Sequence, residues 1–459
     1  MSPPDNIPPC DLRAPGETGC RLTTRHVLAI ALPITLSNAT VPLIGFVDAT
    51  VIGQLGETRL IAAVALAAQI FSFLYFIFNF LRMGTTGLTA QATGARDSSE
   101  IAANLARALL VACTIGVFLV VLQVPITEIG LWLMGASEHV SNDAREYIYC
   151  RIWAAPAALS NFALLGWFFG IGRARLAFVV QLILNGINIL LSIIFVLAAG
   201  WGIAGVALAS VFAEYIAVFL GLFIARRELH ILGAHARGYA ITQLSELRRL
   251  FAVSSDILIR TIGLQIAMSF FVAQSARTGD LALASNHVLL NIVLITVYMI
   301  DGFAFAVETL VGQSIGARDR TRFRDAIRLS AQGALVTSGV LSLFLWTSGP
   351  VLIDFMTTSV EVRSAAREYL IWAALVPVAS VWCFMLDGIF IGATATSTMR
   401  NMMLISLVGY FLAWAILMPA FQNHGLWLSL HILFLLRAIT LGWALPGLYS
   451  RFRSEEEHF

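Results

Sequence analysis

The sequence predicts an all-α integral membrane protein, with twelve transmembrane helices in two related bundles of six. Of the 459 residues, 58% are hydrophobic and only 12% are charged, whereas a soluble domain carries about 25% charged residues. The mean hydropathy is +0.83. The apolar residues form long runs rather than the alternating pattern of a membrane β-barrel. In addition, the two halves of the chain share motifs at one constant spacing.

Apolar runs bounded by glycine, proline and charged residues mark the predicted spans in chain order. A helix needs roughly 20 residues to cross a hydrocarbon core of about 30 Å. The runs of sufficient length are residues 25–53, 60–92, 100–124, 143–171, 176–198, 202–225, 246–276, 281–314, 325–348, 365–391, 399–419 and 425–447. An even number of spans places both termini on one side of the membrane.

The first span combines one acid with two prolines. Asp48 is the single charged residue within 27–53. An acid at the centre of a membrane helix costs about 2.5–3.5 kcal/mol on insertion scales and usually serves function. Pro33 and Pro42 each remove a backbone hydrogen bond and can kink the helix. We therefore expect Asp48 to act in a moving part. The structural alternative is an acid that caps a neighbouring helix or pairs with an arginine.

The distribution of arginine predicts the orientation of the chain. Few arginines fall in the loops opposite the termini, and these are Arg59, Arg145, Arg277, Arg363 and Arg367. Because basic loops stay inside, both termini are predicted to be cytoplasmic. The longest polar connection follows the sixth span and divides the chain. The predicted parts are a cytoplasmic tail at 1–24, an N-lobe at 25–225, a cytoplasmic linker at 226–245, a C-lobe at 246–448 and a cytoplasmic tail at 449–459.

The two halves repeat at a constant shift. The motif QATGARD at 91–97 matches QSIGARD at 313–319, a shift of 318 − 96 = 222. The same shift carries AREY at 144–147 onto AREY at 366–369. It also superposes Met134, Gly166 and Gly170 on Met356, Gly388 and Gly392. One shift over so long a stretch indicates two bundles in the same membrane orientation, as in parallel-repeat transporters.

The fifth span carries polar residues at helical spacing. Asn185, Asn188 and Ser192 share one face, because residues three and four apart are neighbours on a helix. Asparagine facing lipid is unfavourable, so this face should look into an N-lobe cavity, although interhelical hydrogen bonding is an equal alternative. The shift of 222 places Asp48 opposite Phe270. Whatever Asp48 does therefore belongs to the N-terminal half.

The C-terminal half has buried charges of its own. Asp256 and Arg260 stand at i,i+4 on the seventh span, a spacing that suits a self-neutralising pair. For these charges a structural ion-pair or gate role is at least as well supported as transport chemistry. The cavity candidates of this half are Asp256, Arg260, Asp301, Glu308 and Asp387. Arg82 and Arg437 stand near span ends and are expected to be interfacial.

Several classes of protein are excluded by missing motifs. The sequence has no Walker pattern and no HExxH arrangement. Its five cysteines lack metal-ligand spacing. We therefore expect no catalytic residue, cofactor, metal site or nucleic-acid partner. Transport driven by an ion gradient is the function that remains.

Five segments resemble the MATE family of multidrug and toxic compound extrusion proteins, in the branch of the DNA-damage-inducible protein F. They are LPITLSN, VDATVIGQLG, LRMGTTGLTAQATGARD, IDGFAFAVETLVGQSIGARD and LDGIFIGAT. The resemblance implies an efflux carrier whose two six-helix lobes form a V. It also implies export of organic cations and amphipathic drugs in exchange for protons or sodium. The coupling acid of the family corresponds to Asp48, its kink proline to Pro33, and its fifth-helix asparagine to Asn188. Several relatives carry a second acid where this chain has Ser192.

Together these features predict a monomeric, proton-coupled antiporter of the bacterial inner membrane. Protonation of Asp48 would couple proton entry to the alternating-access export of cationic or amphipathic drugs. Sodium coupling through Asp48 and Asn188 is the nearest alternative, but the missing second acid disfavours it. A flippase for a lipid-linked precursor would need a strongly cationic central cavity. A membrane enzyme or receptor without flux is the alternative from another class.

Overall fold

The computed structural model describes residues 22–54, 57–135, 137–234 and 243–450, and within these ranges no residue is in a β-strand. The described residues contain 10 helical segments that are long and apolar enough to cross a membrane. The prediction of an all-α chain with many membrane helices is confirmed. Most of the two predicted tails, residues 235–242 of the predicted linker and the side chain of Pro42 lie outside the described residues.

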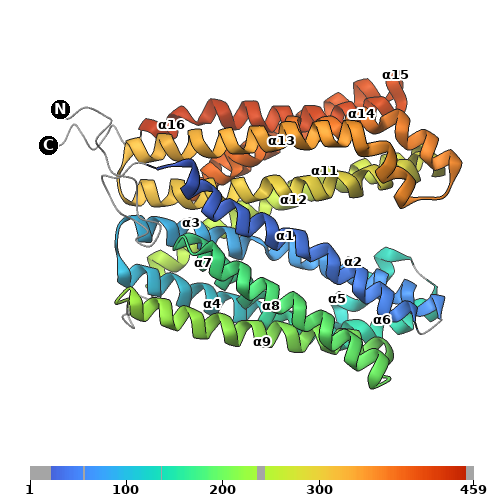
Figure 1. Cartoon of the computed structure of the whole chain (residues 1–459), viewed down its shortest axis with the longest axis horizontal. Helices are drawn as coiled ribbons and strands as arrows, with labels where there is room; N and C mark the ends of the chain where they lie inside the picture. The colour runs from blue at the N-terminus through green and yellow to red at the C-terminus, as the bar shows by residue number, and fades with distance from the viewer. Residues whose placement is uncertain (1–21, 55–56, 136, 235–242, 451–459) are drawn as a thin grey trace. The chain divides into compact units, whose positions relative to one another are not determined.

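The chain forms two compact units, which we describe separately. The N-unit comprises Leu36–Ala92 and Asp97–Phe251. Its helices run from blue to green in Figure 1. They are α2 (Thr58–Phe78), α3 (Phe80–Gly94), α4 (Ser98–Val121), α5 (Gln123–Met134), α6 (Glu138–Arg151), α7 (Ala155–Gly170), α8 (Ala174–Ile193) and α9 (Gly202–Ile231). A 3₁₀ turn joins α6 to α7, and a π-helical turn follows α8.

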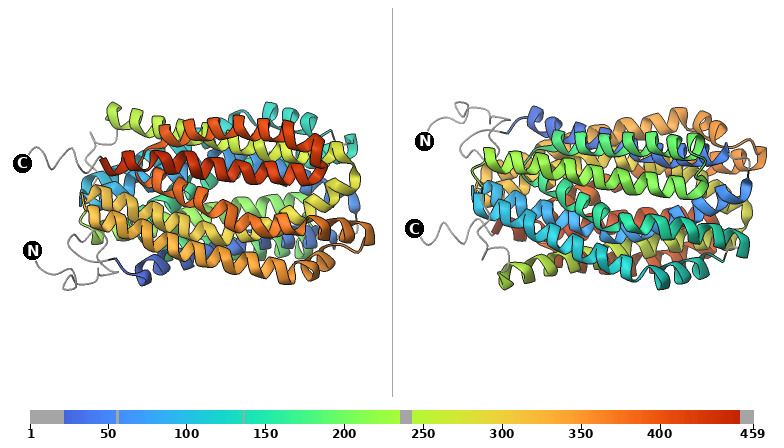
Figure 2. Two further views of the ribbon diagram at one scale, coloured as in Figure 1. Left: turned by 90° about the horizontal axis from the view of Figure 1, so that it is seen from above. Right: turned by 90° about the horizontal axis from the view of Figure 1, so that it is seen from below.

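The C-unit comprises Met1–Thr35, Thr93–Arg96 and Ala252–Phe459. Within it α12, α13 and α14 pack against one another, and α14 also packs against α15 (yellow to red in Figure 2). The helices are α11 (Leu244–Thr278), α12 (Asp280–Gly316), α13 (Arg320–Met356), α14 (Val360–Gly392), α15 (Thr396–Ala444) and α16 (Pro446–Ser450).

Every predicted span overlaps a helix, and the differences are local. Helix α5 was not predicted, because its run of 12 residues is too short to span a membrane. Helix α9 continues to Ile231, so the first residues of the predicted linker are helical. Two predicted spans lie within α15, which breaks at Gln422, where φ is 49° and ψ is −126°. This conformation is non-helical, so the chain turns there.

Helix α1 (Thr24–Gly53) continues through both prolines as one helix. The boundary between the compact units falls inside α1, between Thr35 and Leu36. Pro33 precedes this boundary and Pro42 follows it. Within the C-unit, α1 packs closely on α12, since a Cβ on Gly302 would lie 2.1 Å from Thr35 Oγ1.

The backbone repeats with the sequence shift of 222. Arg96 and Arg318 both adopt left-handed conformations, with φ of 57° and 55°. Gly172 and Thr394, for which 394 − 172 = 222, also share this region, with φ of 76° and 50°. Side chains other than glycine avoid left-handed conformations unless the surrounding structure requires them. The two halves therefore share turn geometry as well as motifs.

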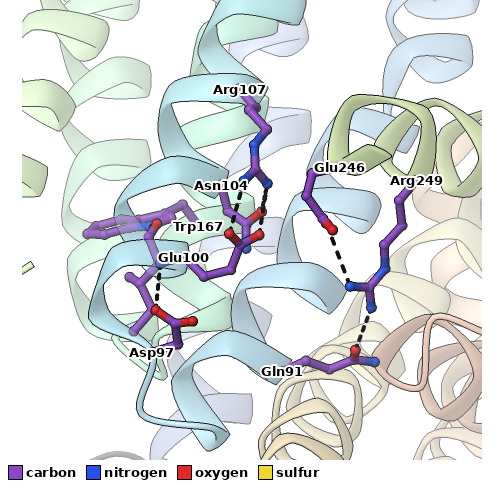
Figure 3. A network of polar contacts seen from close by, with 9 residues as sticks. Gln91, Asp97, Glu100, Asn104, Arg107, Trp167, Glu246 and Arg249 are labelled. Atoms are coloured by element: carbon purple, nitrogen blue, oxygen red, sulfur yellow. Dashed lines mark hydrogen bonds and ion pairs between the residues drawn. The ribbon is translucent and has the colours of Figure 1, made fainter. Parts of the chain in front are cut away.

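Each QxxGARD motif ends in an aspartate that caps the next helix. Asp97 accepts a hydrogen bond from the backbone N–H of Glu100 at 3.0 Å, and Asp319 accepts one from Arg322 at 2.9 Å. In the N-unit further contacts hold this turn (Figure 3). Arg107 donates to both carboxylate oxygens of Glu100, at 2.8 and 2.9 Å. Trp167 donates to the carbonyl of Ile101 at 3.0 Å and so joins α7 to α4.

The repeated glycines mark equivalent helix crossings. A Cβ on Gly166 would lie 2.3 Å from the carbonyl oxygen of Arg82, and one on Gly388 would lie 2.3 Å from that of Ala304. Since 304 − 82 also equals 222, α7 crosses α3 as α14 crosses α12. Only glycine permits such close backbone approach.

We expect Gly388→Ala to destabilise the protein by about 1–3 kcal/mol, the usual cost of forcing an extra methyl group into a packed contact. Gly339→Ala on α13 is the matched control, because nothing lies within 4 Å of its Cβ position. The control should be neutral or stabilising by up to about 1 kcal/mol. Thermal unfolding midpoints in detergent compare the two variants. Equal midpoints would show that α14 and α12 can move apart at this crossing without loss of stability.

Candidate functional site

Asp48 lies in the interior of the N-unit. Its side chain is buried, with 7% of the residue exposed, and Oδ1 accepts a hydrogen bond from Ser192 Oγ at 3.0 Å. Closer to the start of α1, Asn185 Nδ2 donates to Thr40 Oγ1 at 2.5 Å. From the first of these contacts along the chain (Thr40 with Asn185) to the second (Asp48 with Ser192), the residue numbers increase on both α1 and α8. The two helices therefore run parallel. The predicted polar face of α8 is therefore the face that meets α1.

The third predicted residue of α8, Asn188, faces α9. Asn188 Nδ2 donates to Ser210 Oγ at 2.8 Å. Its Oδ1 atom is buried and has no hydrogen-bond partner within the described part of the chain. Asn185 also accepts a hydrogen bond from Gln181 Nε2 at 3.0 Å. All three polar residues of α8 thus make interhelical hydrogen bonds, while Asn188 keeps one buried acceptor atom unused.

A guanidinium and a second carboxylate complete the polar cluster. The charge of Arg151, at the end of α6, interacts electrostatically with Asp48 and also with Glu214 on α9. Asn161 Nδ2 on α7 donates to Glu214 Oε2 at 2.7 Å and to the backbone carbonyl of the same residue at 3.1 Å. We call Asp48, Arg151, Asn161, Asn188 and Glu214 the N-unit cluster.

Aromatic rings surround the guanidinium of Arg151. Its Cζ lies 5.4 Å from the centroid of the Phe71 ring and 5.9 Å from that of Tyr147. Phe71 in turn contacts Tyr75, with 5.7 Å between ring centroids. Such contacts stabilise a desolvated cation by cation–π attraction. Helices α1, α2, α6, α7, α8 and α9 all contribute to this one polar interior.

In the C-unit, the predicted pair of Asp256 with Arg260 is wrong. Arg260 instead forms a salt bridge with Asp387 on α14. Asp256 accepts hydrogen bonds from Arg400 Nη1 at 2.6 Å and from Thr396 Oγ1 at 3.0 Å. The i,i+4 spacing permits a pair, but packing brings α14 to one residue and the first turn of α15 to the other.

Arg437, which we expected near the membrane interface, lies inside the C-unit. Only 1% of Arg437 is exposed, and its Nη2 lies 2.5 Å from Asp387 Oδ2. Arg260 and Asp387 are equally enclosed, at 6% and 5% exposed. Asp387 therefore serves two buried arginines, and we call these three residues the C-unit triad.

The remaining charged candidates occupy separate positions. Arg82 is buried and donates from Nε to Asn79 Oδ1 at 3.1 Å. Glu308 is buried on α12, and its backbone carbonyl oxygen would lie 2.3 Å from a Cβ on Gly392. Asp301 is half-buried near Tyr298. Neither acid belongs to the C-unit triad.

Comparisons with known proteins identify the family of the chain. Residues 33–194 and 258–415 match the MatE family. Over 412 residues the chain is 37% identical to the DNA damage-inducible protein F of Escherichia coli (strain K12), covering 90% of each protein. The chain belongs to the MatE family. Members of this family are transporters, so this MatE protein is a multi-pass membrane transporter and not an enzyme.

More distant relatives agree with this assignment. The MatE chain is 27% identical over 361 residues to a probable multidrug resistance protein NorM of Neisseria meningitidis, covering 76% of this chain and 77% of that protein. A MATE crystal structure in the bent conformation superposes with a TM-score of 0.85 at 19% identity, covering 94% of this chain and 96% of that chain. An outward-facing multidrug resistance MATE transporter of the MOP superfamily gives a TM-score of 0.85 at 19% identity, covering 96% and 98%. These structures establish the fold of the MatE chain.

Three members of the N-unit cluster were not predicted from the sequence. Arg151, Asn161 and Glu214 lie within predicted spans, and charge inside an apolar run was the signal that singled out Asp48. The same signal marks Arg151 and Glu214. Sequence does not show that these two residues and Asp48 converge, because they stand on three different helices.

The pseudo-symmetry of the MatE chain shows how the halves diverged. The shift of 222 places Asp48 and Ser192 on Phe270 and Trp414. In the N-unit the first pair forms a hydrogen bond. In the C-unit the second pair forms an edge-to-face aromatic contact, with 4.8 Å between ring centroids. The position that holds a buried carboxylate in one unit is thus filled by apolar packing in the other.

Proposed function

We propose that this protein is a secondary active multidrug efflux transporter that exchanges cationic or amphipathic drugs for protons through Asp48. The observation that carries this proposal is a carboxylate enclosed in the N-unit, hydrogen-bonded by Ser192 and within electrostatic reach of one cation, Arg151. Burial and the charges nearby determine whether a carboxylic acid holds or releases its proton. The named function of the NorM relative supports a drug as substrate.

The proposed topology has twelve spans in two six-helix lobes. Ten helical segments meet the length and hydropathy of a span. Helix α1, with 30 residues, adds another, and the break at Gln422 divides α15 into two. We propose that both termini are cytoplasmic, which the arginine distribution favours, and that the protein acts as a monomer in the bacterial inner membrane.

In the proposed cycle, a proton and a cationic drug occupy the N-unit alternately. Ionised Asp48 contributes negative charge that favours a bound cation, and protonated Asp48 does not. Helix α1 carries a proline on each side of the unit boundary at Thr35 and Leu36. Each proline leaves a carbonyl without its helical donor, so α1 can bend there as Asp48 changes charge. This bending would link protonation to alternating access.

Sodium is the less favoured coupling ion. A sodium site needs several oxygen ligands, and the unused Asn188 Oδ1 is one such atom. The Arg151 charge that acts on Asp48 opposes a metal cation there. No group of three or more His, Cys, Asp or Glu residues suited to a metal is found in the described ranges.

The cationic arginines of the C-unit do not favour a flippase. Arg260 and Arg437 share Asp387 and are buried. A lipid-linked phosphate would need arginines that it can reach, whereas Arg260 and Arg437 are only 6% and 1% exposed. The C-unit triad is therefore assigned to the scaffold.

We expect transport to follow a pH gradient in the absence of sodium. Inverted vesicles containing the protein should accumulate ethidium when acidified inside in a sodium-free potassium or choline buffer. Collapsing the gradient with a protonophore should stop uptake, and adding sodium should change the initial rate less than about twofold. Strict dependence on sodium, with no response to the pH gradient alone, would replace the proton with sodium in this proposal.

A further inference from the structure

We propose that Glu214 binds the cationic group of the drug, and that Arg151 makes drug binding at Glu214 and protonation of Asp48 mutually exclusive. When Asp48 is ionised, Arg151 pairs with it and leaves Glu214 to the drug. When Asp48 takes up a proton, Arg151 moves to Glu214 and displaces the drug. This inference rests on the proposed proton–drug exchange and assigns its substrate-binding acid.

The carboxylate of Glu214 is held in place from α7. Asn161, which is 4% exposed, donates from Nδ2 to Glu214 Oε2 at 2.7 Å and to its backbone carbonyl at 3.1 Å. The Oδ1 atom of Asn161 is buried and has no hydrogen-bond partner among the described residues. Glu214 and Asn161 therefore present acceptor oxygens in an apolar interior, which is the chemistry that an ammonium or iminium group requires.

Glu214 and Asp48 lie at different depths. Helices α8 and α9 are antiparallel, and the Asn188–Ser210 hydrogen bond fixes their register. Ser192, which contacts Asp48, lies four residues after Asn188 on α8. Glu214 lies four residues after Ser210 on α9. Because the helices are antiparallel, these two steps lead in opposite directions from the Asn188–Ser210 contact. At 1.5 Å per residue the two levels are separated by about 12 Å along the helix axes. The two acids are thus separate sites rather than a carboxylate pair sharing one proton.

Arg151 is the cation whose charge acts on both Asp48 and Glu214. Its Nε and Nη1 atoms are buried without hydrogen-bond partners within the described residues. A buried N–H group without an acceptor is unfavourable. The guanidinium therefore has free donors for whichever acid is ionised and available.

The charge balance makes the exchange one for one. Among the described residues, the titratable groups that interact electrostatically with Arg151 of α6 are Asp48 from α1, Tyr75 from α2, Tyr147 from α6 and Glu214 from α9. Both tyrosines are neutral near pH 7, since an ordinary tyrosine titrates near 10. Two ionised acids and one arginine leave one negative charge in excess. Either one proton or one monovalent drug cation neutralises it, and Arg151 selects which.

The test measures ethidium binding and proton release on purified full-length protein in detergent. Wild-type protein should bind ethidium more tightly as pH rises and release a proton on binding. Glu214→Gln should weaken binding at least about tenfold at every pH. Asp48→Asn, which mimics the protonated acid, should also bind weakly, because Arg151 then stays on Glu214, and binding should no longer depend on pH.

Arg151→Gln supplies the decisive comparison. Without the guanidinium, protonation of Asp48 should no longer displace ethidium from Glu214. The double variant Asp48→Asn with Arg151→Gln should regain the binding that Asp48→Asn alone loses. Glu228→Gln is the matched control on α9, because Glu228 pairs with Arg173 at 3.1 Å outside the cluster. It should behave as wild type.

The outcomes separate this inference from the proposed function. Wild-type binding that neither depends on pH nor releases protons would overturn the proposed function itself. Proton-coupled binding in wild type, with Glu214→Gln indistinguishable from Glu228→Gln, would overturn the role of Glu214 alone. A double variant that remains as weak as Asp48→Asn would overturn the role of Arg151. Arg151→Lys, which keeps the charge, controls for misfolding and should retain pH-dependent binding.

Discussion

Replacing Asp48 with asparagine is expected to abolish drug resistance while leaving membrane insertion intact. The amide keeps the size of the side chain and can still accept the hydrogen bond from Ser192 Oγ, but it cannot titrate. Without a titrating group on α1, proton entry no longer changes the charge of the N-unit cluster. Minimum inhibitory concentrations in a drug-sensitive host should fall to those of the empty vector.

The control for this variant is Asp354→Asn. Asp354 is a half-exposed acid that pairs with Arg367 at 2.7 Å, outside the N-unit cluster. Its loss should leave resistance near wild type, because exposed ion pairs contribute about 0–1 kcal/mol. Both variants should reach the membrane in equal amounts by immunoblot. Full resistance with Asp48→Asn at normal abundance would remove Asp48 from the coupling mechanism.

Asp387→Asn should be the most destabilising single change in the C-unit. It leaves Arg260 and Arg437 buried at 6% and 1% exposure without the acid that pairs with both. Breaking a buried ion pair from one side typically costs about 3–5 kcal/mol. Asp256→Asn is the matched control, since its partner Arg400 is 32% exposed and can rehydrate. Unfolding midpoints in detergent should fall far more for Asp387→Asn.

Double-mutant cycles distinguish the two possible partners of Arg260. A cycle of Arg260→Ala with Asp387→Ala should be strongly non-additive, because the side chains form a direct salt bridge. A cycle of Arg260→Ala with Asp256→Ala should be close to additive, since Asp256 bonds to Arg400 and Thr396. The reverse pattern would restore the i,i+4 pair and contradict the C-unit triad.

Most of the helical framework was predictable from sequence. Each predicted span overlaps a helix, and the ends differ by a few residues, as at Ile231 of α9. The break at Gln422 falls between two predicted spans. Helix α5 was missed, since a helix of 12 residues carries no membrane-spanning signal. Its fold depends on packing after α4 rather than on its own hydropathy.

The site was predictable only in part. Asp48, Asn185 and Ser192 were singled out because polar groups in apolar runs are rare, and the structure joins α1 to α8 through them. Arg151 and Glu214 gave the same signal and were passed over. The functional roles of all these residues stay predictions until the variants above are measured.

The helical class, the repeat at a shift of 222 and the presence of an acid inside the first helix all follow from the amino-acid sequence. These properties depend on local composition and on similarity between segments, which need no knowledge of packing. The tertiary structure alone decided which charges meet. An arginine side chain reaches several ångströms in many directions, so Arg260 can pair along its own helix or across to α14. Only the packing of α11, α14 and α15 brings Asp387 to Arg260 and Arg437 and leaves Asp256 to Arg400.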